Sequence, residues 1–402
     1  MKVGILTFHR SFNYGAFLQC YSLSSRLKKE FPTVDFEVVD YTPQKVFDSY
    51  AKSHEKQKDL NIREALFALD KGFIPCQNTL PLSKPQLITD DQAQAAAYLN
   101  ERYDAVIVGS DAVWNWNVRG FPNVYFLKDY HGRKFSYAAS AHGLIYQNAT
   151  AEQKDYLRQA FDDFSFIGVR DATTADMVHS VLPEKEVIHN CDPTVFLPLE
   201  IVPCDMQALR QKMERHGVDF SKPLIGLMAG ESIGAEIKHH YADHIQLIGL
   251  YSPNRYADVF LNDLTPFEFA HVFSFFKLTL THFFHGTLLS LKNGTPVIPV
   301  ETMNAFSAVN ETKIKDLLTR LALLEWREEI DHHGKGKLWR AVDRVVHIAD
   351  RDIWNRVIAR MDDFMASDYS ELIKQRLNTE AKAFQPFYEV FSNTIVKKDT
   401  NG

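Results

Sequence analysis

The sequence predicts an α/β protein with two domains, and three observations support this class. At 402 residues the chain is longer than one hydrophobic core usually organises. Near the N-terminus, an apolar run at 3–7, a helical stretch and a second strand at 36–40 form the β-α-β unit from which parallel sheets are built. A second series of strands separated by helices begins at 224–228. We therefore expect two sheets, each flanked by helices.

Composition and charge exclude several classes of protein. A formal net charge of −6 and an isoelectric point near 6.2 give no support for nucleic acid or an anionic membrane as a partner. No run of about 20 apolar residues exists and residues 1–7 lead directly into a strand, so we expect neither a membrane span nor a signal peptide. The four cysteines are scattered without Cys-x-x-Cys spacing, as in proteins with reduced thiols. We expect a cytoplasmic protein.

The loop after the first strand carries Asn13, Tyr14 and Gly15 at the start of a helix. This position suits an approach to a ligand, although a turn that needs the dihedral angles of asparagine and glycine explains it equally. From about 43 to 102 the pattern weakens, and we interpret this stretch as an insertion into the first domain that shapes specificity for an acceptor.

The strand that follows Asp104 has a continuous apolar core at 105–108, which indicates burial on both faces of a parallel sheet. Ser110 and Asp111 follow at its end and are candidate ligand-binding residues. Trp114 lies just beyond them, where an indole either stacks on a sugar ring or covers a core.

Two further strands, at 134–139 and 166–169, each end in a polar residue. His142 follows the first and Arg170 the second. In a parallel sheet both residues would lie at the same edge, where ligands bind. The alternatives are a surface histidine and an arginine that forms a structural pair with Asp171.

The second domain is organised around a strand, turn and helix near residue 285. A capping box, Thr265-Pro266-Phe267-Glu268, predicts a helix from 266 to about 277 that leads into a strand at 279–284. A short helix from Gly286 then ends at Asn293-Gly294, before a strand at 296–300. His285 therefore lies where a strand ends and a helix begins, and the free N–H groups of that first helical turn attract anions.

Two other chemistries fit the sequence poorly. His282 and His285 are three residues apart, but they lack the carboxylate or third ligand of a zinc site, so we predict no metal. No Gly-x-Ser-x-Gly motif indicates a serine hydrolase. If the loops that carry Arg170, His142 and His285 converge, they form a site for a phosphorylated or carboxylated substrate.

Six stretches together resemble the polysaccharide pyruvyl transferase family, and they cover roughly the first three hundred residues. They are Asn13-Tyr-Gly-Ala-Phe-Leu-Gln19, Asp104-Ala-Val-Ile-Val-Gly-Ser-Asp-Ala-Val-Trp-Asn115, Tyr137-Ala-Ala-Ser140, Val169-Arg-Asp171, Asp192-Pro-Thr194, and Phe284-His-Gly-Thr287 with Gly294-Thr-Pro296.

The resemblance implies two Rossmann-like domains that face a cleft, as in GT-B glycosyltransferases, with C-terminal helices that cross back to the first domain. We expect the first domain at 1–215, the second at 216–345 with its donor-side turn at 284–287, and the returning helices at 346–402. No cofactor is implied. The partners are phosphoenolpyruvate as donor and a polysaccharide or lipid-linked glycan as acceptor, and a lipid-linked acceptor would bring the protein into peripheral contact with a membrane.

Carried over by position, Arg170 resembles the arginine that holds the donor's anionic groups, and His285 resembles the histidine after the late strand. Phe284 stands where relatives have leucine, beside Gly286 and Thr287, so only a backbone contact would persist there. His142 is similar to a histidine on the acceptor side. We expect His285 to protonate the donor as a general acid, and His142 or Asp111 to orient or deprotonate the acceptor.

Two other functions remain open at this stage. One is a nucleotide-sugar-dependent glycosyltransferase on the same two-domain architecture. The other is a non-catalytic glycan-binding relative, for which Ala112 and Phe284 at motif positions leave room.

Overall fold

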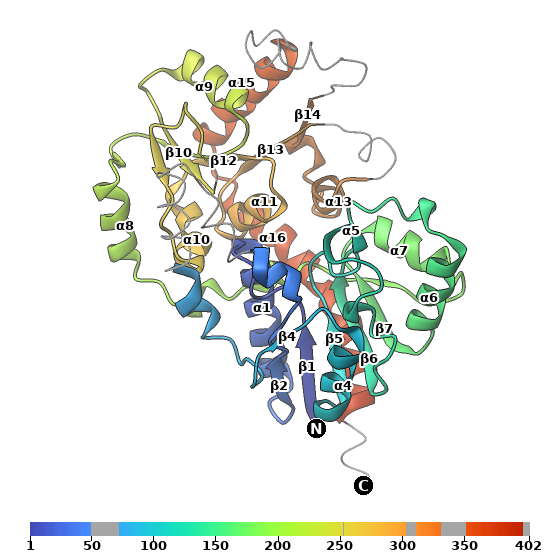
Figure 1. Cartoon of the computed structure of the whole chain (residues 1–402). Helices are drawn as coiled ribbons and strands as arrows, with labels where there is room; N and C mark the ends of the chain where they lie inside the picture. Colours follow the sequence, from blue (N-terminus) through green and yellow to red (C-terminus); the bar gives the residue numbers. More distant parts are fainter. Residues whose placement is uncertain (50–71, 252, 303–310, 331–350, 397–402) are drawn as a thin grey trace. The chain divides into compact units, whose positions relative to one another are not determined.

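The computed structural model describes residues 1–49, 72–251, 253–302, 311–330 and 351–396 (Figure 1). The chain divides into two compact units. Unit 1 comprises Met1–Leu197 and Ala381–Gly402, and unit 2 comprises Pro198–Glu380. The first boundary therefore lies before the predicted 215, and the returning segment begins at 381 rather than 346. Each unit is described by itself.

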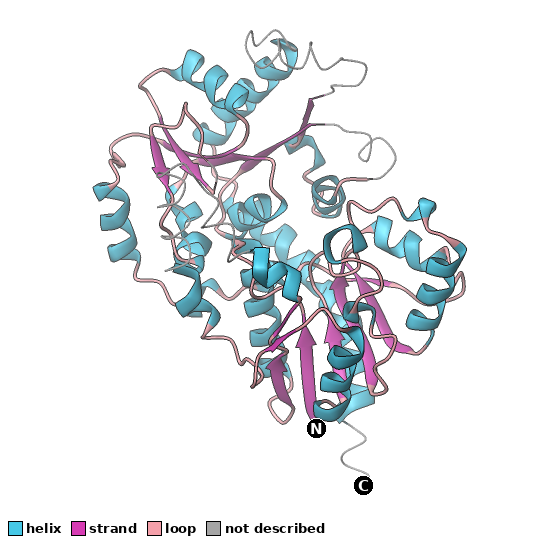
Figure 2. Cartoon of the chain, viewed as in Figure 1, coloured by secondary structure: helices cyan, strands magenta, loops and turns pink. Residues whose placement is uncertain are grey.

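Unit 1 contains a six-stranded parallel sheet (Figure 2, magenta). Val3 on the first strand lies opposite both Phe36 and Ala105, so this strand is central. The strands, in spatial order, are β2 (Asp35–Val38), β1 (Lys2–Leu6), β5 (Ala105–Val108), β6 (Arg133–Ala139), β7 (Phe164–Val169) and β8 (Ile188–His189).

Helices cover both faces of this sheet, and a short parallel pair of strands accompanies it (Figure 1). Further elements of the unit include α1 (Tyr14–Glu30), β3 (Tyr41–Thr42), β4 (Leu87–Ile88), α4 (Gln92–Arg102), α5 (Trp116–Arg119), η1 (Val124–Phe126), η2 (Tyr146–Asn148), α6 (Ala151–Asp162), α7 (Ala172–His179), η3 (Pro193–Phe196), η7 (Ala381–Phe384), α17 (Gln385–Phe391) and η8 (Ser392–Val396).

The core of unit 1 corrects the prediction of an insertion at 43–102. Leu99 of α4 is 1% exposed and belongs to one buried cluster with Val106 of β5 and Phe161 of α6. Helix α4 is thus part of the domain's own hydrophobic core. The charged helical pattern near 61–70 falls outside the described residues.

Aromatic packing explains why only the last part of the chain returns to unit 1. Phe391 of α17 contacts Phe31, Phe36 and Phe135, with ring centroids 4.9 to 5.9 Å apart. Asn190 adds a hydrogen bond from its side chain to the carbonyl of Ala383. Helix α17 therefore covers aromatic side chains of β6 and β7 that would otherwise be exposed on this face of the sheet.

Unit 2 contains a second six-stranded parallel sheet. Its strands, in spatial order, are β11 (Val259–Leu261), β10 (Gln246–Leu250), β9 (Leu224–Met228), β12 (Leu278–Thr281), β13 (Val297–Thr302) and β14 (Glu328–Ile330). Its helices are η4 (Leu199–Ile201), α8 (Met206–Arg215), α9 (Glu231–Tyr241), α10 (Pro266–Val272), η5 (Phe273–Phe275), α11 (Phe284–Lys292), α13 (Lys313–Arg320), η6 (Leu324–Trp326), α15 (Arg351–Ala366) and α16 (Ser370–Glu380).

Local signals in the second domain are confirmed with small shifts. The capping box at Thr265 and Glu268 forms both of its hydrogen bonds, but the helix tightens into a 3-10 turn at Phe273. Asn293 caps α11 and Gly294 follows with φ +74°, a conformation that glycine adopts readily. Helix α11 begins at Phe284, two residues earlier than predicted, so His285 lies inside its first turn.

Candidate active site

Each sheet has one point at which the strand order reverses. In unit 1 the chain first adds β2 on one side of β1 and then β5 on the other. In unit 2 it adds β10 and β11 on one side of β9 and then β12 on the other. Loops on either side of such a point diverge, and ligands of open α/β sheets bind there, beyond the carboxyl ends of the strands. The candidate sites are therefore the loops after β1 and β5 and the loops after β9 and β12.

A buried polar network lies beneath the reversal point of unit 1. Gln19 of α1 donates from Nε2 to Thr7 Oγ1 at 3.0 Å and accepts from Ser110 Oγ at 2.6 Å. All three side chains are almost fully buried. Ser110, predicted to bind substrate, is engaged in holding the loop. Gln19 had no assigned role, and only its position within the first resemblance motif marked it in the sequence.

Asp111 follows this network and is half-buried, so it is the more accessible of the two polar residues. Its φ of 79° lies in the left-handed region, which aspartate tolerates better than most residues. One carboxylate oxygen accepts the N–H of Ala112 at 2.7 Å, and the Asp111 carbonyl accepts the N–H of Ser140 at 2.9 Å. These bonds fix a carboxylate at the sheet's edge, where it can accept a hydroxyl proton.

The structure places Arg170 differently from what the sequence suggested. Its side chain is 1% exposed, and Nη1 donates to Asp192 Oδ2 at 2.8 Å. Burial alone would lower the pKa of Arg170, but the carboxylates of Asp192, Asp111 and Asp171 raise it above its usual value. The guanidinium is therefore enclosed among acids and holds the loops after β5, β7 and β8 together. Contact between Arg170 and a donor stays a prediction.

His142 and Asp171 belong to a second network at the same edge. Asp171 caps α7 and accepts hydrogen bonds from Ser140 Oγ and Thr174 Oγ1, both at 2.6 Å. Ser140 Oγ in turn accepts the N–H of His142 at 3.1 Å, and Asn115 donates to the His142 carbonyl at 2.7 Å. The His142 loop is thus held from both sides, and Asp171 forms hydrogen bonds to this loop and to α7.

Three of the predicted binding residues have structural roles. Asn13 is the N-cap of α1 and accepts the N–H of Ala16 at 3.0 Å, while the neighbouring Gly15 is buried. Tyr14 is 4% exposed and packs on Phe73.

Of the two interpretations of Trp114, stacking on a sugar or covering a core, the structure supports the core. Its indole is fully buried against Phe161 and Phe164 and donates to the carbonyl of Tyr125 at 3.0 Å. Both faces of the ring are covered by the core of unit 1. The indole therefore has a structural role in this core.

In unit 2, α11 begins at the reversal point. Phe283 is its N-cap, and the Phe283 side chain forms no capping hydrogen bond. The entering loop is fixed instead by the N–H of His282, which donates to the Met228 carbonyl, and by the N–H of Phe283, which donates to Thr281 Oγ1 at 3.0 Å. His285 lies in this first turn and is half-buried, with its ring 5.2 Å from that of Phe284.

The other residues of the 284–287 turn are packed. Phe284 is 4% exposed, and Thr287 donates from Oγ1 to the carbonyl of Phe283 at 3.1 Å. A Cβ on Gly286 would lie 2.6 Å from Thr281 Oγ1, so this glycine permits close contact between helix and strand. Of the four, only His285 combines partial exposure with a titratable side chain, and it is the best candidate for chemistry.

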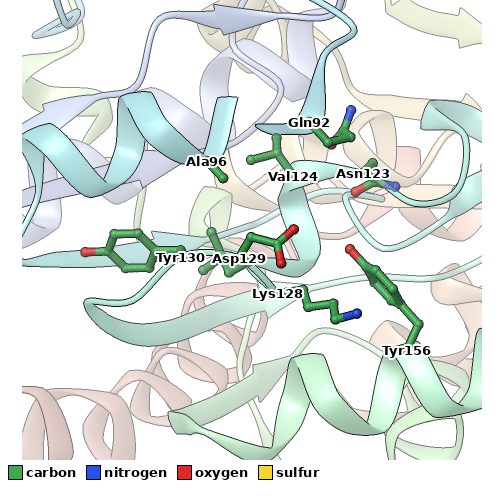
Figure 3. A pocket seen from close by; sticks show the side chains of 9 residues that line it. Gln92, Ala96, Asn123, Val124, Lys128, Asp129, Tyr130 and Tyr156 are labelled. Atoms are coloured by element: carbon green, nitrogen blue, oxygen red, sulfur yellow. The ribbon is translucent and has the colours of Figure 1, made fainter. Parts of the chain in front are cut away.

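A small pocket elsewhere in unit 1 is lined by polar, apolar and aromatic side chains (Figure 3). Lys128 Nζ lies 4.6 Å from the ring centroid of Tyr156, and Asn123 donates to the Gly120 carbonyl. The segment with Lys128 leads into the amino end of β6, away from the reversal point. We assign this pocket no catalytic role.

The described residues show neither a metal-ion cluster nor a membrane-spanning helix. No group of three or more His, Cys, Asp or Glu side chains in these parts of the chain is arranged to hold a metal ion. Across the same residues, no helix has both the length and the apolar character needed to cross a membrane.

Comparison with known proteins bears on fold and family. The family model described as polysaccharide pyruvyl transferase matches residues 13–302. No curated protein matches the chain. Among solved structures, UDP-GlcNAc 2-epimerase from Neisseria meningitidis bound to UDP-GlcNAc is similar with a TM-score of 0.51 and 10% identity, over 98% of this chain and 100% of that one. This likeness confirms the predicted fold class, α/β with two Rossmann-like domains of the GT-B kind.

Two further solved structures are similar at lower scores. The UDP-GlcNAc 2-epimerase from Methanocaldococcus jannaschii has a TM-score of 0.49 and 11% identity, over 90% of this chain and 100% of that one. The ADP-heptose lps heptosyltransferase II of E. coli has a TM-score of 0.40 and 11% identity, over 91% and 99%.

Proposed function

Because the chain belongs to the polysaccharide pyruvyl transferase family, we propose that it transfers the pyruvyl group of phosphoenolpyruvate to two hydroxyls of a glycan and forms a pyruvate ketal. The observation that carries the proposal is the family match across 13–302, which includes the turn with His285 at the reversal point of unit 2. The acceptor is a polysaccharide or a lipid-linked glycan precursor.

The reaction begins with a proton transfer. His285 gives a proton to the methylene carbon of phosphoenolpyruvate, which becomes the methyl group and leaves cationic character on the adjacent carbon. The N-cap of α11, Phe283, forms no side-chain capping hydrogen bond, and the positive end of the helix dipole favours an anion at the start of this helix. The donor's phosphate or carboxylate is therefore stabilised beside the acid that protonates it.

Two hydroxyls of the acceptor complete the reaction. The first oxygen bonds to the cationic carbon, and the second displaces phosphate from the same carbon to close the ketal. Of the two hydroxyl protons, one replaces the proton given by His285 and the other leaves with phosphate. Asp111 is our candidate for the group that accepts the first hydroxyl proton, because its carboxylate is fixed and half-buried at the edge of unit 1.

The test is incubation of the full chain with phosphoenolpyruvate and a panel of galactosyl, mannosyl and glucuronosyl acceptors. Phosphate release that matches a gain of one pyruvyl mass on an acceptor supports the proposal. His285→Ala is the matched variant, and near-normal turnover in this variant would remove His285 from the acid role.

The rival function is a nucleotide-sugar-dependent glycosyltransferase, which shares this fold class. Thermal stabilisation by a nucleoside diphosphate, with none by phosphoenolpyruvate, would favour it. Stabilisation by glycans without turnover of any donor would favour a non-catalytic glycan-binding relative.

A further inference from the structure

A small pocket opens at the carboxyl end of β1, on segments that the proposed chemistry does not use. Its walls come from the loop after β1, from β3 and the residues that follow it, from α5 and from η1, so it lies at the reversal point of unit 1. The residues that matter for its chemistry are Phe8, His9, Arg10, Tyr41, Arg119 and Tyr125.

Cations outnumber acids around this pocket. Arg10 donates from Nε and Nη2 to the two oxygens of Asp40, at 2.9 and 2.6 Å. His9 is fully buried, with Nε2 3.0 Å from Asp40 Oδ1 and Nδ1 3.2 Å from the Thr7 carbonyl. The Asp40 carboxylate is thus shared by Arg10 and His9, and Arg119 lines the same pocket.

Arg119 adds a further cation, and it forms no ion pair with an acid among the residues that the structure describes. Its guanidinium carbon lies 3.9 Å from the centroid of the Phe8 ring. Nε of Arg119 is buried and has no hydrogen-bond partner in the described parts of the chain. A buried donor without an acceptor is costly, and an oxygen of a bound anion would satisfy it.

Aromatic residues complete the pocket and keep its donors in place. Tyr125 packs edge-on against Phe8 and also contacts Tyr41. Burial, followed by the nearby Tyr125 and Asp90, raises the pKa of Tyr41, so its hydroxyl keeps its proton near neutral pH. No aspartate or glutamate lines the pocket itself.

We propose that this pocket binds an anionic group of the acceptor, a phosphate or diphosphate ester attached to the sugar that receives pyruvate. The inference rests on the proposed function, which assigns the donor to α11 in unit 2 and leaves the reversal point of unit 1 to the acceptor. A diphosphate link occurs in both lipid-linked and nucleotide-linked sugars, and its chemistry is the same at the pocket.

The first test measures binding by calorimetry, with inorganic pyrophosphate and the full chain. Arg119→Gln should weaken the affinity about tenfold or more, since a charge-assisted hydrogen bond is lost. Arg158→Gln is the matched control, because Arg158 is exposed on α6 and pairs only with Asp155 across one helical turn. Absence of binding to the wild type, or equal affinity in Arg119→Gln, would overturn the proposal.

A second variant distinguishes a loss of binding from a loss of folding. Arg119→Lys keeps the charge but not the planar stacking on Phe8, so we expect intermediate affinity at an unchanged melting temperature. Phosphoenolpyruvate is the competing probe. If it displaces pyrophosphate from the wild type and its own binding depends on Arg119, the pocket belongs to the donor and the acceptor assignment fails.

The third test compares acceptors with the same sugar. One carries a short isoprenoid diphosphate, one a nucleoside diphosphate and one no phosphate. A preference for either diphosphate in kcat/KM that disappears in Arg119→Gln supports the inference, and the preferred form identifies the source. Equal use of all three overturns it. If no acceptor is pyruvylated, the proposed function fails, while the pyrophosphate titration still decides whether the pocket binds anions.

Discussion

Gly286→Ala tests whether the turn that carries His285 depends on close contact between α11 and the sheet. A Cβ at this position would lie 2.6 Å from Thr281 Oγ1 and 3.1 Å from the Met228 sulfur. The sulfur belongs to a flexible side chain, but Thr281 is fully buried on β12 and its β-branched side chain is stiff. The substitution must therefore displace either the threonine or the start of the helix.

The magnitude follows from three contributions. Overpacking of a well-packed interior costs about 1–3 kcal/mol. Movement of Thr281 also weakens the hydrogen bond that its Oγ1 accepts from Phe283 N–H, worth about 0.5–1.5 kcal/mol. Alanine recovers up to about 1 kcal/mol of helix propensity. We expect a net destabilisation of about 1–3 kcal/mol and a loss of pyruvyl transfer, because the first turn of α11 shifts.

Urea denaturation followed by circular dichroism measures the stability. Gly230→Ala is the control, since this glycine caps α9 on the neighbouring loop and a Cβ there meets nothing within 4 Å. Thr281→Ala combined with Gly286→Ala should recover part of the loss, because the atom that clashes is removed. If Gly286→Ala is as stable as Gly230→Ala, the packing argument is refuted.

Three further predictions concern single side chains. His285→Gln should lower kcat for phosphate release by about 10²–10⁴, as expected for loss of a general acid, whereas His282→Gln should change it little; equal effects would contradict the assignment. Asp192→Ala removes the acid that is hydrogen-bonded to the buried guanidinium of Arg170 and should cost about 3–5 kcal/mol in urea denaturation. A loss below about 1 kcal/mol would show that the neighbouring Asp111 and Asp171 compensate. Burial would raise the pKa of Asp40, but hydrogen bonds from its arginine and histidine neighbours lower it to about 2. The folded pKa of Asp40 is thus below the ordinary 3.8, so about 2 kcal/mol of stability is present above pH 4 and is lost as the pH falls to 2. The stability of Asp40→Asn should therefore depend less on pH in this acid range. Parallel pH profiles of the variant and the wild type would disprove the linkage.

Strands with a full apolar run could be predicted from the sequence, and short edge strands could not. Residues 105–108 are apolar throughout and form β5, and residues 224–228 form β9. By contrast, β8 has two residues and β14 has three, too few for any pattern to appear. These strands depend on pairing with a neighbour that the sequence does not identify.

Helix α4 could be predicted as a helix, but its place in the core of unit 1 could not. Its charged surface suggested an insertion, yet Ala95 and Leu99 face the core. A helix on the outside of a sheet buries only one narrow face, and the remaining positions are polar whether the helix belongs to the domain or to an addition. Composition alone does not separate the two cases.

The partner of Arg170 shows why a site is harder to predict than a strand. Sequence adjacency suggests a pair with Asp171, but an aspartate that directly precedes a helix directs its carboxylate to the first-turn N–H groups, and Asp171 accepts from Thr174 in this way. Arg170 then needs an acid from a neighbouring strand, and β8 supplies Asp192. The strand order that brings β8 beside β7 is set by packing of whole layers. The position of His285 depends only on the junction of its own strand and helix, so it could be located from the sequence. The partners of the polar residues in unit 1 depend on the strand order, so they could be assigned only once the sheet was known.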